Sequence, residues 1–145
     1  MANFATVATI ISFVLLNTLT VVSSCNTTKF ILSTEKETFF DAYRKCLQIG
    51  FKPLEIVLEE DAKCVGDKLR NHTINHWWIF ATNLGDYVNY YWLHTGKPLI
   101  YTQFESEQPN NPRNENCLVM YSKASPNPVW HDFPCDSKFR YICKY

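Results

Sequence analysis

The sequence predicts a small α+β domain stapled by disulfides. Six cysteines occur among its 145 residues, an even number that is typical of a disulfide framework in a secreted protein. Two segments with helical periodicity come first, and short stretches rich in Trp, Tyr, Phe and Ile follow them. Gly and Pro punctuate these stretches, which indicates short strands joined by tight turns. Helices followed by several short strands are typical of the α+β class.

The first 24 residues contain no charged side chain, and their apolar run from Phe4 to Val22 ends in small residues. This pattern predicts a secretory signal peptide over residues 1–24, with cleavage after Ser24. A retained N-terminal membrane anchor is the alternative. The mature part, residues 25–145, is long enough for one domain with one hydrophobic core.

The mature part contains all fourteen basic and all fourteen acidic residues of the chain. A net charge near zero argues against a nucleic-acid partner or an anionic membrane surface. No further apolar stretch is long enough to span a bilayer, so we expect no membrane insertion.

The cysteines favour disulfides over a zinc site. There is no C-x-x-C pair, and the four histidines do not cluster at the spacing of zinc ligands. Two sequons, at Asn26 and Asn71, agree with the secretory route and are predicted glycosylation sites.

The first element is a strand within residues 25–33, and a helix follows within residues 34–50. Phe40, Tyr43 and Leu47 fall at i, i+3 and i+7 and predict its apolar face, with Cys46 one position away. Thr38 or Ser33 could cap the start of this helix, and Gly50 suits its end.

A second helix is predicted within residues 58–72, where Ala62, Val65 and Leu69 share one face. Strands are expected from residue 76 onward, and much of the chain between residues 80 and 116 is expected to form loops. A long ordered loop in a small domain is usually functional. The chain's four tryptophans are predicted to fill the core.

The order and spacing of six segments resemble the C-type lectin-like domain family, over a match from about Phe30 to Tyr145. One departure is Phe80, which stands where the family usually has glycine. The segments are, in chain order, FFDAYRKCLQIG (39–50), HWWIFATNL (76–84), YYWLHTGKPLIYTQFESEQPNN (90–111), ENCLVMY (115–121), VWHDFPC (129–135) and RYICKY (140–145). The resemblance implies two helices, short antiparallel strands and a long loop region that carries the binding site.

The resemblance also implies two disulfides, Cys46–Cys143 and Cys117–Cys135. Cys25 and Cys64 are extra to this pattern, and we predict that they pair with each other. The alternative is a bond from Cys25 to another chain.

The sugar-binding members of the family hold one Ca²⁺ with oxygen ligands from three segments. These are the residues flanking a cis proline, a glutamate two residues before a cysteine, and an Asn-Asp pair after a tryptophan. The matching residues here are Gln108 and Asn110 around Pro109, Glu115 before Cys117, and His131 and Asp132 after Trp130.

The chemistry of these residues suits calcium, which takes six to eight hard oxygen ligands. A cis X-Pro bond would direct the side chains of Gln108 and Asn110 toward one point. Their amides can offer oxygens to the metal and N–H donors to sugar hydroxyls. We therefore predict Gln108, Asn110, Glu115 and Asp132 as metal ligands, and the same four with His131 as sugar-binding residues.

Two departures from the family predict weak calcium affinity. His131 replaces an asparagine, and imidazole nitrogen is a poor ligand for Ca²⁺. The Gln108–Asn110 loop has two amides, whereas the mannose-type Glu-Pro-Asn and galactose-type Gln-Pro-Asp loops each carry one acid. The glutamine slightly favours galactose-type sugars. The positions of a second calcium are Asn111 and Asn116, which are neutral, so we expect that site to be weak or absent.

The sequence therefore predicts a secreted lectin that binds glycans or glycoproteins, with Ca²⁺ as cofactor. The alternative is a protein-interaction module on the same fold that has lost calcium and sugar binding. A histidine beside carboxylates titrates near neutral pH, so His131 raises the hypothesis of pH-sensitive binding. We do not expect an enzyme, because no nucleophile–base pair stands out and the cysteines are expected in bridges.

Overall fold

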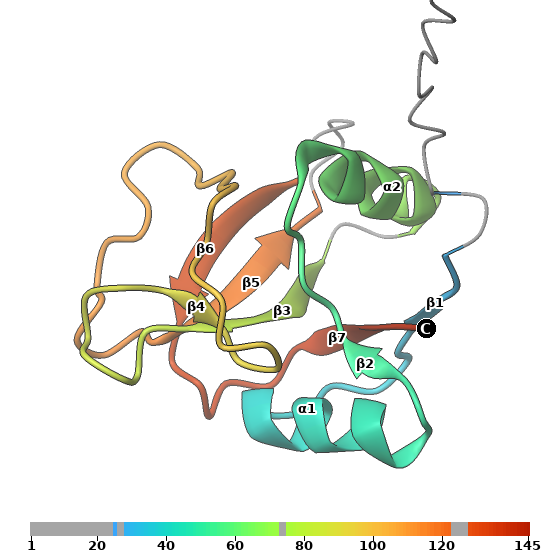
Figure 1. The fold of residues 1–145 in the computed structure, drawn as a ribbon, viewed down its shortest axis with the longest axis horizontal. Coiled ribbons are helices and arrows are strands. Elements are labelled where there is room, and N and C mark those ends of the chain that lie inside the picture. Colours follow the sequence, from blue (N-terminus) through green and yellow to red (C-terminus); the bar gives the residue numbers. More distant parts are fainter. Residues whose placement is uncertain (1–24, 26–27, 73–74, 123–127) are drawn as a thin grey trace, which may run out of the picture.

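The computed structural model describes residues 25, 28–72, 75–122 and 128–145. The predicted signal peptide and Asn26 lie outside these residues. The described elements confirm the predicted α+β class (Figure 1). In chain order they are β1 (Phe30–Leu32), α1 (Phe39–Gln48), β2 (Lys52–Pro53), α2 (Glu59–Leu69), β3 (His76–Thr82), β4 (Tyr91–Trp92), β5 (Cys117–Tyr121), β6 (Val129–Phe133) and β7 (Arg140–Lys144). Neither helix in these ranges is long and apolar enough to cross a membrane.

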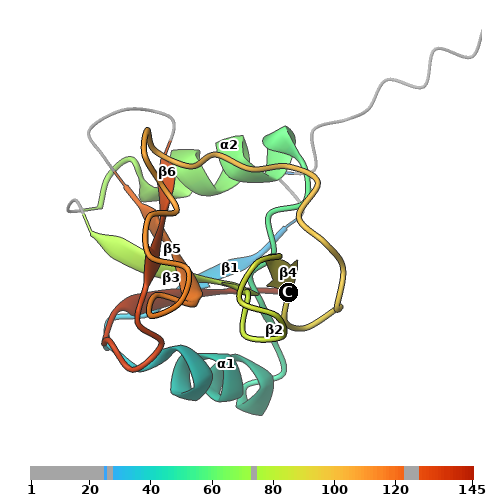
Figure 2. The same ribbon diagram turned by 90° about the vertical axis from the view of Figure 1, so that its left-hand side faces the viewer.

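The strands form one sheet in the order β1-β7-β3-β5-β6, with β2 added to β7 and β4 to β3. All of its pairings are antiparallel, as expected, except that β7 runs parallel to β3. This exception arises because the last strand inserts between β3 and the first strand, β1. The two helices lie on opposite sides of the sheet (Figure 2).

Helix α1 begins after Thr38, one of the two predicted caps, and ends before the predicted Gly50. Thr38 is its N-cap, and its Oγ1 accepts a hydrogen bond from the backbone N–H of Asp41 at 3.3 Å. Gly50, just beyond the last turn, has φ of +75°, a conformation that glycine adopts without steric cost.

The apolar face predicted for α1 is wrong. Phe40 and Leu47 are 49% and 43% exposed, whereas the buried side chains are Phe39, Ala42 and Cys46. The disulfide from Cys46 to β7 fixes which face of the helix turns inward. Phe39 on that face packs edge-on against Trp78, with 5.4 Å between the ring centroids. Periodicity alone could not choose, because apolar residues occur on both faces of this helix.

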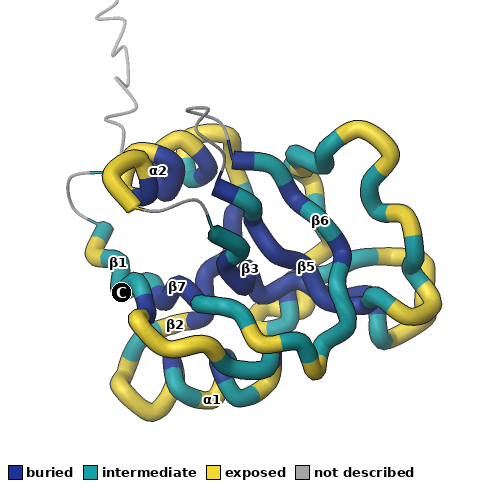
Figure 3. Tube along the Cα trace, turned by 180° about the vertical axis from the view of Figure 1, so that it is seen from behind, coloured by how far each residue is buried: buried dark blue, intermediate teal, exposed yellow. Residues whose placement is uncertain are grey.

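The face predicted for α2 is confirmed, since Ala62, Val65 and Leu69 are all buried. The four tryptophans also lie in the core as expected, each at most 1% exposed: Trp77, Trp78, Trp92 and Trp130. Buried positions follow the inner strands, and the long loops around them alternate between intermediate and exposed residues (Figure 3).

All three predicted disulfides are present in the structure: Cys25–Cys64, Cys46–Cys143 and Cys117–Cys135. They join residues 39, 97 and 18 positions apart, respectively. Under the chain-entropy account, bridges over such loops each stabilise a fold by about 3 to 5 kcal/mol. The first fastens Cys25 to α2, and the second ties α1 to β7.

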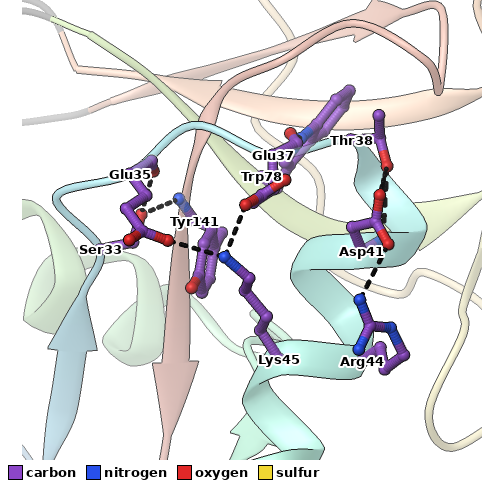
Figure 4. A network of polar contacts seen from close by, with 9 residues as sticks. All are labelled: Ser33, Glu35, Glu37, Thr38, Asp41, Arg44, Lys45, Trp78 and Tyr141. Atoms are coloured by element: carbon purple, nitrogen blue, oxygen red, sulfur yellow. Dashed lines mark hydrogen bonds and ion pairs between the residues drawn. The ribbon is translucent and has the colours of Figure 1, made fainter.

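A polar network holds the segment between β1 and α1 (Figure 4). The Lys45 ammonium contacts the carboxylates of Glu35 at 2.7 Å and Glu37 at 2.5 Å. These hydrogen bonds raise the pKa of Lys45. The Trp78 indole donates to the backbone oxygen of Glu37 at 2.8 Å, so the same segment is also anchored to the core.

The orientation of α1 predicts different effects for two adjacent phenylalanines. We expect Phe39→Ala to lower the free energy of unfolding by about 3 to 5 kcal/mol, because it leaves a cavity in the core. Phe40→Ala, the matched control, should cost no more than about 0.5 kcal/mol, as expected for an exposed position. Urea unfolding of both variants measures the difference, and equal losses would contradict the orientation.

Candidate functional site

The long loop between β4 and β5 lies against the edge of the sheet. Gln103 accepts a backbone hydrogen bond from Trp130 at 2.8 Å, and Glu105 donates one to Trp130 at 3.2 Å. Phe104 forms a parallel bridge with Trp130, and the two rings lie 5.9 Å apart. The loop thus runs beside β6 as a short extension of the sheet.

Strand β6 sends its successive side chains to opposite faces of the sheet. Trp130 and Asp132 are buried on one face, which the loop covers. His131 lies on the other face, where its ring is near those of His76 and Tyr121. His131 and Asp132, which the resemblance places together at the site, therefore lie on opposite faces of the sheet.

Asp132 fastens the loop that contains Pro109. One carboxylate oxygen accepts the backbone N–H of Asn110 at 3.1 Å, and the other accepts that of Asn111 at 3.0 Å. Asp132 is only 2% exposed, so these bonds satisfy a carboxylate that is shielded from water. The Gln108–Pro109 peptide bond is cis, as the resemblance implies.

Glu115 lies close enough to Asp132 for the two charges to repel each other. Burial raises the pKa of Glu115, and the negative charge of Asp132 raises it further, while a hydrogen bond from Asn111 acts in the opposite direction. Burial also raises the pKa of Tyr90, and the charges of the same two carboxylates add to that effect. The Tyr90 hydroxyl donates to the backbone oxygen of Glu115 at 3.3 Å. Two acids and a phenol thus share one environment, which a cation would stabilise.

Gln108, two residues before Asn110 in the chain, carries a further candidate oxygen ligand. Its side-chain Oε1 is buried and has no hydrogen-bond partner among the described residues. An unpaired buried amide oxygen is costly unless a ligand or water completes it. Together with the Glu115 and Asp132 carboxylates and the neighbouring Asn110 amide, it gives the hard-oxygen set that Ca²⁺ takes. The residues therefore fit a calcium ion.

The described residues contain no cluster of three or more His, Cys, Asp and Glu side chains that could hold a metal ion. This finding is compatible with the predicted set, which has only two acids and depends on amide oxygens for the remainder. Such a set is too oxygen-rich and too poor in nitrogen and sulfur for zinc.

His131 is not brought to the predicted metal ligands. Its Nε2 lies 2.7 Å from a carboxylate oxygen of Glu105, in the first half of the long loop. A second imidazole, that of His76, lies nearby. Burial lowers the pKa of His76 to about 4, with a smaller contribution from the charge of His131. The carboxylate beside His131 is thus Glu105, and not the Glu115–Asp132 pair.

Asn116, predicted at the position of a second calcium, is held in the interior by hydrogen bonds to the protein. It is buried, and its amide donates to Asn83 at 2.9 Å and to the backbone oxygen of Pro112 at 2.7 Å. Asn83, itself fully buried, also donates to Pro112, at 3.0 Å. We did not predict Asn83 from the sequence. Its signal was a polar residue directly after the apolar strand HWWIFAT.

Known proteins share this sequence pattern. A family model described as the lectin C-type domain matches residues 18–145. The salivary C-type lectin 2 of Aedes albopictus is 28% identical, over 93% of this chain and 95% of that protein. The α-N-acetylgalactosamine-specific lectin of Patiria pectinifera is 29% identical over 52% of this chain. That match spans only 45% of the Patiria protein.

The fold is similar to solved carbohydrate-recognition domains. The mouse scavenger receptor C-type lectin domain superposes with a TM-score of 0.71 and 25% identity, covering 81% of this chain and 87% of that domain.

We expect neutral substitutions of the two carboxylates to change the stability of the calcium-free protein in opposite directions. Asp132→Asn should lower the free energy of unfolding by about 1 to 3 kcal/mol, because its amide cannot accept from both loop N–H groups. Glu115→Gln should instead raise the melting temperature at neutral pH, since it removes repulsion from Asp132. Thermal unfolding in EDTA measures both effects, and destabilisation by both variants would contradict the inferred repulsion.

The effect of Glu115→Gln should also depend on pH. Because folding raises the pKa of Glu115, the folded state binds its proton more readily than the unfolded state. The wild type therefore gains relative stability as the pH falls from neutral through this raised pKa toward 4.5. The advantage of the Glu115→Gln variant should shrink over that range and vanish below it. A constant difference between the melting temperatures at about pH 7 and about pH 3.5 would exclude this linkage.

Proposed function

The chain belongs to the C-type lectin domain family, and on this premise we propose that it is a secreted lectin whose glycan binding depends on Ca²⁺. Its family and its lectin relatives support carbohydrate binding, and the family consists of binding proteins rather than enzymes. The calcium site, the sugar preference and the secretion are our own proposals.

Four residues would hold the ion: Gln108, Asn110, Glu115 and Asp132. The observation that carries this proposal is the buried Gln108 Oε1, which has no hydrogen-bond partner among the described residues. The same loop contains Glu115, whose pKa is raised by burial and by the negative charge of Asp132. A bound Ca²⁺ would supply open coordination positions for sugar hydroxyls. The protein side would contribute the amide donors of Gln108 and Asn110, which can bond the same hydroxyls.

The proposed affinity for calcium is modest. The loop has one acid fewer than the sugar-binding loops that it resembles, and His131 is directed to the other face of the sheet. We therefore leave His131 out of the proposed sugar contacts. Gln108 favours galactose-type sugars slightly, and the name of the Patiria relative, a lectin specific for α-N-acetylgalactosamine, agrees with that preference.

Secretion is supported by the three disulfides, by the charge-free segment 1–24, and by a salivary relative in Aedes albopictus. Asn71 is exposed just beyond α2, so an oligosaccharide could be attached there without disturbing the core. We propose it as a glycosylation site, and Asn26 as another on its sequon alone.

One observation favours the protein-interaction module as the second candidate. The Asp132 carboxylate already binds the backbone of Asn110 and Asn111, so the loop can close without a metal ion. In that case the partner would bind a surface, and the exposed Phe40 and Leu47 on α1 offer apolar area for it.

Chromatography of the refolded mature protein on galactose and mannose resins separates the two candidates. For the lectin we expect retention in Ca²⁺, release by EDTA, and a melting temperature that rises with calcium. Asn110→Ala should abolish retention, because it removes both a metal ligand and a sugar contact. Asn71→Ala, at an exposed asparagine outside the loop, is the matched control and should be retained like the wild type.

Passage through both resins, with no effect of calcium on the melting temperature, would exclude the lectin. Retention that persists in EDTA would mean that the sugar binds without the proposed ion.

A further inference from the structure

A concave surface includes Arg113, which lies in the same loop segment as the proposed calcium ligands Asn110 and Glu115. It encloses about 420 Å³ and is lined by Asp86, Tyr87, Val88 and Arg113, and we call it the Tyr87 cleft. We propose that the Tyr87 cleft is a second sugar subsite, which receives a neutral pyranose ring of an oligosaccharide whose terminal sugar is bound at the calcium site. This inference rests on the proposed function and extends it from a single sugar to a chain of sugars.

The position of the cleft follows from the loop that both sites share. Arg113 lies two residues after Asn111, whose backbone is bonded to Asp132. It also lies two residues before Glu115, a proposed calcium ligand. We expect the extended saccharide to follow this segment toward Arg113.

The two walls of the cleft are held together by buried hydrogen bonds. Pro112, next to Arg113, has its backbone oxygen bonded by the amides of Asn83 at 3.0 Å and Asn116 at 2.7 Å. Asn83 also accepts, through its backbone oxygen, the N–H of Tyr87 at 2.7 Å. The same asparagine thus fixes both walls, and a preformed cleft loses little conformational entropy when a ligand binds.

Tyr87 is held in an unusual backbone conformation. Its φ is +60°, a left-handed value that is uncommon for residues other than glycine, asparagine and aspartate. Tyr87 is 51% exposed, and the neighbouring Val88 is 71% exposed. Core packing therefore does not explain an aromatic residue here. An exposed ring beside polar groups can pack on the C–H face of a pyranose.

The charged groups of the cleft suit hydroxyl groups. Asp86 accepts backbone N–H groups from Val88 at 2.9 Å and Asn89 at 2.8 Å, and the Asn89 side chain at 2.7 Å. A carboxylate has about four lone-pair positions, so one remains for a ligand donor. Among the described residues, Arg113 lines the cleft without a side-chain hydrogen bond or ion pair, and its guanidinium offers up to about five donors.

The two charges also select between neutral and acidic sugars. Hydrogen bonds from the Asn89 and Val88 amides lower the pKa of Asp86, which keeps it anionic at neutral pH. An acidic sugar would be attracted by Arg113 and repelled by Asp86 in the same cleft. A neutral ring can accept from Arg113 and donate to Asp86, so it satisfies both groups.

Calorimetry with mono- and trisaccharides tests the inference in Ca²⁺. Galactose and mannose measure the calcium site alone, whereas galactotriose and mannotriose also reach the cleft. We expect the better trisaccharide to bind about 2- to 10-fold more tightly than its monosaccharide, the range expected for one aromatic contact. Tyr87→Asn should remove this gain and leave monosaccharide affinity within about twofold. Asparagine tolerates positive φ, so the variant removes the ring and keeps the backbone.

Arg113→Gln should also reduce the gain in affinity of the trisaccharide over its monosaccharide. Its matched control is Arg70→Gln, at an exposed arginine beside α2 and far from Arg113 in the chain, which should leave this gain unchanged. Monosaccharide binding without any trisaccharide gain, or a gain that survives Tyr87→Asn, would overturn the inference and leave the proposed function standing. A larger gain for a sialylated trisaccharide would also overturn it. Trisaccharide binding that persists in EDTA and is lost in Tyr87→Asn would support the cleft while contradicting the calcium site. Binding of neither sugar would overturn both.

Discussion

The hydrogen bonds from the backbone of Asn110 and Asn111 to the Asp132 carboxylate are the contact on which the candidate site depends. They join a loop that has no regular structure to a strand that is anchored in the core by Trp130. Because each carboxylate oxygen binds a different residue, the loop is fixed in both position and direction.

A second set of contacts holds the far side of the loop. The buried amides of Asn83 and Asn116 both bond to the backbone of Pro112, and Thr82 donates to the backbone of Asn116 at 2.7 Å. Hydrogen bonds to buried side chains therefore hold the loop at two points, although these parts of it form no strand or helix. The loop retains two unfavourable features, the unpartnered buried oxygen of Gln108 and the repulsion of Glu115 by the charge of Asp132. The proposed calcium ion would relieve both.

The replacement of asparagine by His131 has a different meaning in the structure than in the sequence. In the sequence it removes an oxygen ligand from the predicted metal site. In the structure the imidazole has its own environment, with Glu105 at 2.7 Å and His76 and Tyr121 beside it on the other face of the sheet. The Glu105 contact joins β6 to the long loop. His131 thus supports the loop from the face opposite to Asp132.

The sequence was sufficient to predict the α+β class, the end of α1 at Gly50, the buried face of α2 and the core position of the four tryptophans. These features depend on local signals, such as caps, periodicity and aromatic content, and the resemblance added the disulfide partners. Three features could be seen only in the folded chain: the buried face of α1, the parallel pairing of β7 with β3, and the separation of His131 from Asp132. Each of these depends on contacts between residues far apart in the chain. Phe39 and Phe40 look alike until the Cys46–Cys143 bridge orients their helix, and Asn83 gains its role only when Pro112 is folded against it.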